Sequence, residues 1–472
     1  MSDLANNSGC PNCARLEAMV AALLKEVVDL KARISDLEAQ VKANSSNSSK
    51  PPSSDPPWQS PPPSKPRSGN KPGGQPGHSG AFRQRLPIER VKHIIDYVPE
   101  KCNHCKASLA GQYGPHLPET SWHQVAELPP VLAEVTEHRA HARTCACCGK
   151  VTCAEIPAAI RAHCAGPNLA AALSYLGGCL HASKRAIQET CETLFGVPLS
   201  LGTISKLEAD TSAALEAPHA EALEAVRAAP IKNVDETGWA KHGKLCWLWL
   251  AATASLAVFA IHAKRGKAGF RNLLGRAVKG LVCSDRWSVY ALVEVWKRQL
   301  CWAHLKRDFQ KFKELGGAAR TTGLAGLRAV KKTFEAWNEW KEKRIDRPEL
   351  QERVVHVSMA LYRALERGRD GPDKKVRRFC KRLLKDYSAL WLFADVDGVE
   401  PTNNHAERCL RPAVMWRKRS FGNHSEEGCR FTERLLTAVQ TLKLQKRPVL
   451  GYLKSAVLSH REGRPVPSLL AA

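Results

Sequence analysis

The sequence predicts a multidomain α+β protein, and three observations lead to that prediction. The chain has 472 residues, which is more than one ordinary domain needs. Near the N-terminus, apolar residues recur at alternating spacings of three and four, the period of a long helix that pairs with another. Farther along, short apolar runs alternate with helix-sized intervals, as in a mixed sheet. Composition changes along the chain predict seven segments: 1–43, 44–80, 81–163, 164–229, 230–309, 310–399 and 400–472.

Segment 1–43 is expected to form a parallel coiled coil, and hence a homodimer or a larger assembly. β-Branched residues at the a positions with leucine at d favour a parallel pair. The seam consists of Val20, Val27, Ile34 and Val41 at a, and Leu16, Leu23, Leu30 and Leu37 at d. The alternative, a helix packed on its own chain, is disfavoured because segment 44–80 is rich in Ser, Asn, Pro, Gly and Lys and is expected to be a disordered linker. The Cys10-Pro-Asn-Cys13 pair alone is too weak a pattern to assign a metal.

Segment 81–163 carries two Cys-x-x-Cys pairs and is expected to be a zinc-binding module. The pairs are Cys102 with Cys105 and Cys145 with Cys148. Four thiolates close a tetrahedral site, which makes the zinc structural. The run from Val125 to Arg143 resembles strands and is expected to fold back as a hairpin that joins the pairs. Cys147 and Cys153 are competing ligands, and ordinary thiols without a metal remain the alternative.

Segment 164–229 is expected to be helical and to bind DNA. Ser183 to Phe195, a turn at Gly196-Val-Pro198, and Leu199 to Thr211 have the proportions of a helix-turn-helix. Two helices joined by Gly and Pro are also common in simple packing, and that alternative stays open.

Segment 230–309 carries two carboxylates that follow apolar runs. Asp235 ends Ile231-Lys-Asn-Val-Asp235, and Asp285 ends Gly280-Leu-Val-Cys-Ser-Asp285. The predicted order is three strands, a helix, a strand, then a strand and a helix. A ribonuclease-H-like sheet has this order, with its first and fourth strands side by side, so we expect Asp235 and Asp285 to meet. Glu407 would join them from a late helix. Three carboxylates suit two Mg²⁺ or Mn²⁺ ions, which activate a water or a hydroxyl for attack on a phosphodiester.

The composition favours a nucleic-acid partner. Lys and Arg number 71 against 46 Asp and Glu, for a formal net charge of +25. Lys374 to Lys385 predicts a basic helix with an apolar stripe. The sequence has no secretory signal pattern, and the apolar stretch from Leu245 to Ala263 is expected to be a buried hairpin because Thr253-Ala-Ser255 divides it. We expect a reducing, cytoplasmic location without membrane contact, associated with the bacterial nucleoid.

Several motifs resemble those of one known family. They occur in this order: Asn47-Ser-Ser-Lys-Pro-Pro-Ser-Ser-Asp55, Gly73-Gly-Gln-Pro-Gly-His78, the two Cys pairs, Asp235-Glu-Thr237, Asp285, Cys301-Trp-Ala-His304 with Arg307, Asn403-Asn-His-Ala-Glu-Arg408 with Leu410-Arg-Pro412, and Arg417-Lys-Arg-Ser-Phe421. Together they resemble the transposases of the insertion-sequence family sixty-six, which are DDE transposases, over nearly the whole chain. One departure is Arg417-Lys-Arg419, where an asparagine often follows Arg-Lys.

The resemblance implies cleavage at transposon ends and strand transfer into target DNA, with Asp235, Asp285 and Glu407 as catalytic metal ligands. It also implies a helical insertion in the ribonuclease-H-like core, about Gln310 to Val399, between the fifth strand and the helix of Glu407, and accessory proteins from the same element as partners. Basic residues in the late motifs are expected to contact DNA: His304, Lys306, Arg307, Arg408, Arg411, Arg417 and Lys418. Trp287 and Trp302 are expected to be packing residues. The alternatives are a metal-dependent DNA nuclease without strand transfer, and a repressor that binds DNA through the zinc and coiled-coil segments with a dead catalytic core.

Overall fold

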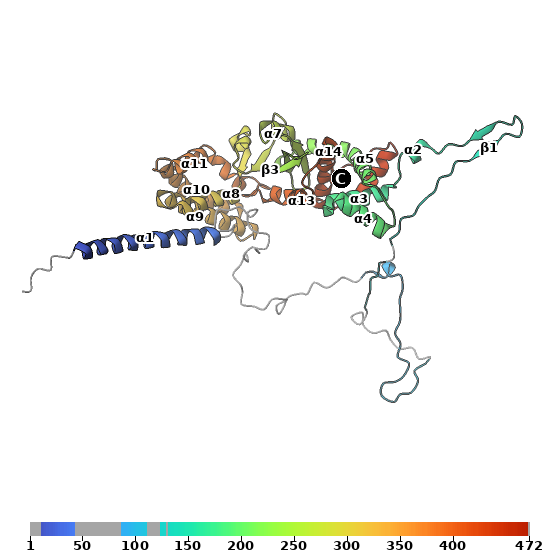
Figure 1. Cartoon of the computed structure of the whole chain (residues 1–472), viewed down its shortest axis with the longest axis horizontal. Helices are drawn as coiled ribbons and strands as arrows, with labels where there is room; N and C mark the ends of the chain where they lie inside the picture. Colours follow the sequence, from blue (N-terminus) through green and yellow to red (C-terminus); the bar gives the residue numbers. More distant parts are fainter. Residues whose placement is uncertain (1–10, 43–85, 111–122, 129–130, 471–472) are drawn as a thin grey trace, which may run out of the picture. The chain divides into compact units, whose positions relative to one another are not determined.

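A computed structural model describes residues 11–42, 86–110, 123–128 and 131–470 of the chain (Figure 1). Their contacts divide them into two compact units, one within residues 61–133 and one containing the rest. The predicted linker at 44–80 lies outside the described residues. Cys10 of the Cys10-Pro-Asn-Cys13 motif lies outside them too.

The N-terminal helix α1 spans Pro11–Lys42, so the predicted long helix is confirmed. Six seam residues whose side chains are described are each about half exposed: Leu16, Val20, Leu23, Val27, Leu30 and Ile34. Apolar side chains at this spacing are usually covered by a second helix. Pairing of two α1 helices remains a prediction.

A mixed five-stranded sheet forms the centre of the larger unit (Figure 1). Its strands are β3 (Ile231–Lys241), β4 (Lys244–Ala252), β5 (Ala257–His262), β6 (Leu281–Ser284) and β7 (Arg298–Leu300). They lie in the order β5-β4-β3-β6-β7. β3, β4 and β5 form an antiparallel meander, whereas β6 and β7 continue the sheet parallel to β3. The predicted hairpin at Leu245 to Ala263 and the pairing of the first and fourth strands are therefore confirmed. Among the described residues, no helix is long and apolar enough to cross a bilayer.

The starts of β3 and β6 are held together by backbone and side-chain contacts. Helix α7 (Lys267–Leu274) crosses from β5 to β6, and Gly280 then turns the chain into β6 with φ of +65°. A Cβ at Gly280 would lie 2.5 Å from the carbonyl oxygens of Ala229 and Pro230, so only glycine fits this approach. The buried Lys232 amine donates to the carbonyls of Arg227 and Lys279, and burial lowers its pKa to about 8.

The outer edge of β5 is covered by helix α14 (Glu426–Leu444). Alternate backbone N–H groups of β5 donate to side chains one helical turn apart: Ile261 to Glu433, Phe259 to Thr437 at 3.0 Å, and Ala257 to Thr441 at 3.1 Å. Four helical residues rise about 6 Å and two strand residues about 6.7 Å, so the two spacings match. The edge strand is thereby satisfied without another strand.

The four helices directly before the sheet form one group: α3 (Pro167–Leu180), α4 (Lys184–Phe195), α5 (Leu201–Ala214) and α6 (Glu216–Ala228). Of this group, α3, α5 and α6 pack against C-terminal helices. Ser183 and Ser200 cap α4 and α5, and Gly196 ends α4 in the left-handed conformation, so the predicted two helices and turn are confirmed as secondary structure. α3 and α5 pack against α14 and α15 (Val449–Arg461). Segments 164–229 and 400–472 therefore share a core.

A helical insertion follows β7, with α9, α10 and α11 gathered as one group (Figure 1). Its α-helices are α8 (Trp302–Leu315), α9 (Gly317–Lys341), α10 (Arg347–Arg369), α11 (Lys374–Lys385) and α12 (Leu392–Asp395). A 3-10 turn at Tyr387–Leu390 lies between α11 and α12. Two other 3-10 turns, Ser288–Leu292 and Val295–Lys297, lie before β7 and outside the insertion. α11 buries Val376, Phe379 and Leu383 and exposes all seven of its basic residues, as the sequence predicts. Trp302 is fully buried, and its indole N–H donates to the Leu390 carbonyl, which confirms its packing role.

The region of the Cys pairs contains little regular structure. It includes a 3-10 turn at Ile88–Arg90, strands β1 (Ala142–Thr144) and β2 (Val151–Cys153), and helix α2 (Ala158–Arg161). β1 and β2 form a hairpin around the second Cys pair. The hairpin predicted for Val125 to Arg143 is wrong, since residues 123–128 and 131–141 form no strand. Val125, Leu128 and Val135 are at least 80% exposed, so no apolar face is buried there to stabilise a strand pair.

Candidate active site

The register of the parallel strands brings Asp235 and Asp285 to one level of the sheet. The last paired residues of β3 and β6 are Asn233 and Cys283, and each aspartate lies two residues farther on. On the other side of β6, Ser284 pairs with Leu300, and the N–H of Cys301 donates to the Ser284 carbonyl at 2.9 Å. Asp235, which the sequence placed at the end of an apolar run, lies inside β3, because β3 continues to Lys241 in pairing with β4. It is level with Asp285 and Cys301, which directly follow β6 and β7, so the three positions form a row across neighbouring parallel strands. Neighbouring strands are about 4.8 Å apart, so ions can bridge side chains from this row.

Asp235 is half-buried in a strongly acidic environment. Burial raises its pKa well above the usual value, and the charges of Glu236, Asp285 and Glu407 raise it further. The N–H of Glu236 donates to Asp235 Oδ1 at 2.9 Å and partly opposes that shift. The N–H of Trp287 donates to Asp285 Oδ1 at 2.8 Å and fixes that carboxylate just beyond β6. Carboxylates that repel one another in this way are favourable ligands for a divalent cation.

Glu407 reaches the site from the first turns of helix α13 (Asn404–Ser420), whose start is fixed by Asn403. Asn403 is 1% exposed, and its Nδ2 donates to the Val234 carbonyl while its Oδ1 accepts from Asn233 Nδ2. Both contacts are to β3, one and two residues before Asp235. His405 adds a contact between its Nε2 and the Thr253 carbonyl at 2.7 Å. The start of α13 is therefore anchored to the strand that carries Asp235.

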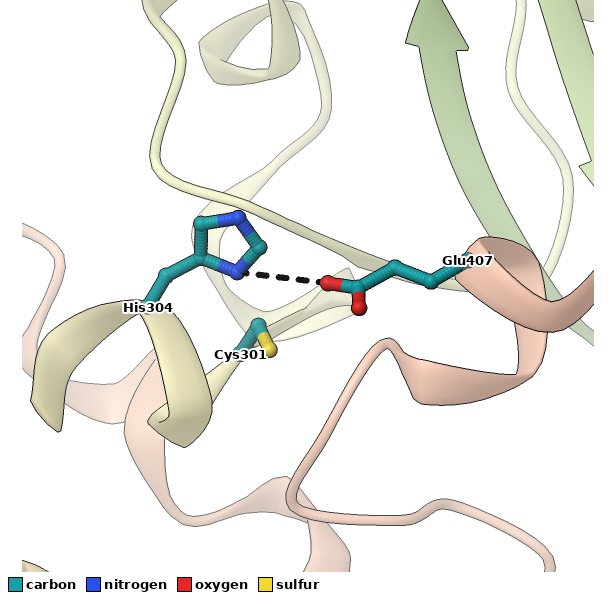
Figure 2. A group of neighbouring side chains, drawn as sticks. All are labelled: Cys301, His304 and Glu407. Atoms are coloured by element: carbon teal, nitrogen blue, oxygen red, sulfur yellow. Dashed lines mark ion pairs between the residues drawn. The ribbon is translucent and has the colours of Figure 1, made fainter. Parts of the chain in front are cut away.

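Glu407 also faces Cys301 and His304 (Figure 2). His304 lies in the first turn of α8, with its Nδ1 3.9 Å from Glu407 Oε1. One potential ligand atom from each of the three side chains lies within 4.8 Å of the other two. Burial and the charge of Arg307 lower the pKa of His304, while the carboxylates of Asp285 and Glu407 partly oppose them. The neutral imidazole is therefore favoured.

A fourth carboxylate, Glu236, lies beside the aspartates and was missed in the sequence. Its side chain is 2% exposed, and it accepts hydrogen bonds from the Tyr290 hydroxyl and from Arg265. The Arg265 guanidinium stacks on the rings of Trp247 and Trp287, at 4.6 and 4.2 Å from the ring centroids. Its position directly after Asp235 in the predicted strand region is the one available signal, because an acid buried in a sheet needs a partner.

The basic residues predicted to contact DNA differ in their surroundings. Arg408, Arg411 and Lys418 are exposed, and their spacing places them on one face of α13. Lys306 is exposed on α8, whereas Arg307 is half-buried. Arg417 is half-buried, and its Nη1 donates to the Thr237 hydroxyl and to the Gly238 carbonyl. Arg417 therefore ties α13 to β3.

The two Cys pairs form loops of the same backbone shape. In the first, Cys102 N–H donates to the Ala107 carbonyl, and Lys106 has φ of 63°. In the second, Cys145 N–H donates to the Lys150 carbonyl, and Gly149 has φ of 68°. Backbone N–H groups within each loop lower the pKa of Cys102 and of Cys145. Each loop alone presents two thiols suited to chelation, and the loops belong to different compact units.

Comparison with known proteins identifies the family. Residues 163–430, more than half of the chain, match the family described as Transposase IS66 family. The chain belongs to the IS66 family of transposases. Residues 7–84 of this IS66 transposase also match a family of unknown function, DUF6444.

One curated relative is the uncharacterized protein y4qI of Sinorhizobium fredii (strain NBRC 101917 / NGR234). It is 27% identical over 178 residues, which are 36% of this chain and 32% of the relative. The matched stretch thus spans about a third of the relative's length. Since the IS66 match contains Asp235, Asp285, Glu407 and the strands that carry the two aspartates, the family and the geometry point to the same part of the chain.

Proposed function

We propose that this protein is a DDE transposase that nicks DNA at the ends of its element and joins the freed 3′ ends to target DNA. The observation that carries the proposal is that Asp285 and Glu407 lie near enough to Asp235 for their charges to raise its pKa, within a family match to transposases. The strand order β5-β4-β3-β6-β7, with Asp235 within β3 and Asp285 directly after the adjacent parallel strand β6, supports a ribonuclease-H-like core.

The three carboxylates fit Mg²⁺ or Mn²⁺ because they supply oxygen ligands and because Asp235 is destabilised as an anion. Two bound ions would activate the attacking oxygen and stabilise the leaving oxygen of a phosphodiester. Asp235 and Asp285 would hold the ions at the end of the sheet. Glu407 would complete the site from α13, with Asn403 fixing its approach. No side chain needs to form a covalent bond with DNA.

DNA is proposed to contact several basic surfaces of the larger unit. The exposed face of α13 bears Arg408, Arg411 and Lys418 and begins one residue after Glu407. Lys306, Arg307 and His304 follow the end of β7, where they are suited to bind a phosphate near the metal ligands. The α4–α5 pair is the candidate for recognising element ends, with Ser205 and Lys206 exposed on α5. Pairing through α1 would join two ends in one assembly, and accessory proteins of the same element are proposed partners.

The Cys loops are proposed to hold one structural zinc ion. Cys102, Cys105, Cys145 and Cys148 supply four thiols on two loops of matching backbone shape. A zinc bound to all four would link parts of the chain that have little secondary structure of their own.

The decisive experiment incubates full-length protein with labelled element ends, a supercoiled target plasmid and Mg²⁺. A transposase gives both nicked ends and products in which the labelled 3′ end is covalently joined to the plasmid. Nicking without joining, with Mn²⁺ also tested, would instead identify a nuclease. Binding of the ends with neither reaction would favour a repressor.

A further inference from the structure

A soft ligand set lies directly beside the carboxylates proposed to hold Mg²⁺. Cys301 follows β7, His304 lies in the first turn of α8, and Glu407 approaches from α13 (Figure 2). Only Glu407 offers the oxygen ligand that Mg²⁺ prefers, whereas a thiol and an imidazole select zinc and similar metals. The three side chains therefore suit a different ion from the one that catalysis is proposed to use.

The distances fit a zinc site that needs only a small closure. Zinc bond lengths of 2.0 to 2.3 Å in a tetrahedral site place neighbouring ligand atoms about 3.3 to 3.6 Å apart. The candidate ligand atoms lie within 4.8 Å of one another, and His304 Nδ1 is 3.9 Å from Glu407 Oε1. The Glu407 side chain is 44% exposed, so it is free to rotate and bring its carboxylate closer to His304 and Cys301.

The surroundings of the ligand atoms are consistent with a bound cation. His304 Nδ1 is buried and has no hydrogen-bond partner among the described residues. Buried polar atoms seldom lack a hydrogen-bond partner, so a metal ion bound to this nitrogen would explain its position. The Cys301 sulfur accepts the N–H of Asn403 at 3.2 Å, a contact that would stabilise a thiolate. That N–H belongs to the residue that anchors α13, so sulfur and carboxylate are held by one connected structure.

We infer that Cys301, His304 and Glu407 form a Zn²⁺ site that inhibits the enzyme by withdrawing Glu407 from the Mg²⁺ centre. On binding, the Cys301 thiol loses its proton to solvent and the metal takes one sulfur, one nitrogen and one oxygen ligand. A fourth position stays open to water. Zinc binding itself does not depend on the proposed function, whereas the inhibitory effect rests on it.

The first test measures zinc binding without any reaction. Full-length protein that retains its tightly bound zinc after dialysis is titrated with Zn²⁺, and bound metal is determined at equilibrium. The titration should fill one site beyond the zinc already bound. Cys301→Ser and His304→Ala should each lower the zinc affinity of that site by about tenfold or more, because an alcohol or a methyl group replaces a strong zinc ligand. The matched control is Cys164→Ser, which removes an exposed thiol outside the site and should leave this binding unchanged.

A second measurement uses Co²⁺ in place of Zn²⁺. The thiolate-to-cobalt absorption should decrease in Cys301→Ser by the contribution of one sulfur, and near-ultraviolet circular dichroism checks that the variant is folded. His304→Ala provides an independent variant should Cys301→Ser fail to fold. Unchanged zinc affinity in a folded variant of either residue would overturn the site.

The final arm adds Zn²⁺ to nicking reactions that contain excess Mg²⁺. Zinc should inhibit the wild-type protein, and Cys301→Ser should need about tenfold more zinc for half inhibition relative to its own activity without zinc. Equal sensitivity of both proteins would contradict inhibition through this site. If the wild-type protein nicks no DNA, the proposed function fails while the titration still decides whether zinc binds here.

Discussion

At the residue scale, Asn403 shows how a buried side chain can fix the helix that carries a proposed metal ligand, Glu407. Its amide spans from α13 to the backbone and side chain of β3, just before Asp235. Because it is 1% exposed, no water can replace these contacts without rearrangement. The distance between Glu407 and the aspartates therefore depends on Asn403.

We expect Asn403→Ala to lower the rate of end nicking by about tenfold or more and to destabilise the protein by about 1–3 kcal/mol. The adjacent exposed Asn404 provides the matched control, and Asn404→Ala should change both quantities little. Single-turnover nicking and urea unfolding give the two readouts. Equal nicking rates in the two variants would show that Asn403 does not position Glu407.

The sequence predicted some of these residues better than others. Asp235 and Asp285 could be placed together because each ends an apolar run in the sequence and the strand order makes β3 and β6 neighbours. Cys301 was named in a motif but not as a ligand, because its approach to Glu407 depends on the start of α13 more than a hundred residues later. The Arg265 and Tyr290 contacts of Glu236 likewise join residues distant in the chain, and no local pattern predicts them.

At the element scale, the contact between α14 and β5 closes one edge of the sheet. Polar residues of α14 that would ordinarily face solvent are buried: Glu433, Thr437 and Thr441 are at most 2% exposed. The sequence alone suggests an ordinary amphipathic helix there, because the N–H groups that these side chains satisfy are supplied by a distant strand.

Thr437→Val should destabilise the protein by about 1–3 kcal/mol, because it keeps the side-chain shape but leaves the Phe259 N–H without an acceptor. Thr437→Ser retains the hydroxyl and is the matched control, with a smaller loss from the missing methyl group. Denaturant unfolding followed by tryptophan fluorescence compares the two. Equal stability of the valine variant and the wild-type protein would mean that the edge contact contributes nothing measurable.

The Cys loops are the second element whose role can be tested. Protein dialysed against metal-free buffer should retain about one zinc ion per chain, and Cys105→Ser should lose it. Cys153→Ser, which changes an exposed cysteine on β2, is the control and should retain the metal. Unchanged zinc in Cys105→Ser would assign the ion to other cysteines, with Cys147 the nearest candidate.

At the scale of the whole molecule, the predicted assembly depends on α1. Its exposed seam can be covered only by another surface, and β-branched and leucine residues at heptad positions favour a second copy of the same helix. Two chains paired in this way could hold two element ends together.

Deleting residues 1–43 should weaken self-association and reduce the pairing of two ends, while nicking at single ends is preserved. The proposed metal ligands belong to the sheet and α13, which the deletion leaves intact. Sedimentation and native gels with labelled ends measure the two effects. Were the truncated protein as dimeric as the full chain, with equal yields of paired ends, the dimer contact would have to lie elsewhere.

The central claim is that Asp235, Asp285 and Glu407 form one metal-dependent centre that cuts and joins DNA. The most direct measurement compares end nicking and strand transfer in Asp235→Asn, Asp285→Asn and Glu407→Gln, with Glu427→Gln on the exposed start of α14 as control. We predict that each of the three variants loses both reactions by about a thousandfold or more, in Mg²⁺ or Mn²⁺, while binding of the ends stays within about threefold of wild type. The control should react normally. Strand transfer retained by any of the three folded variants would contradict the account and remove that residue from the centre.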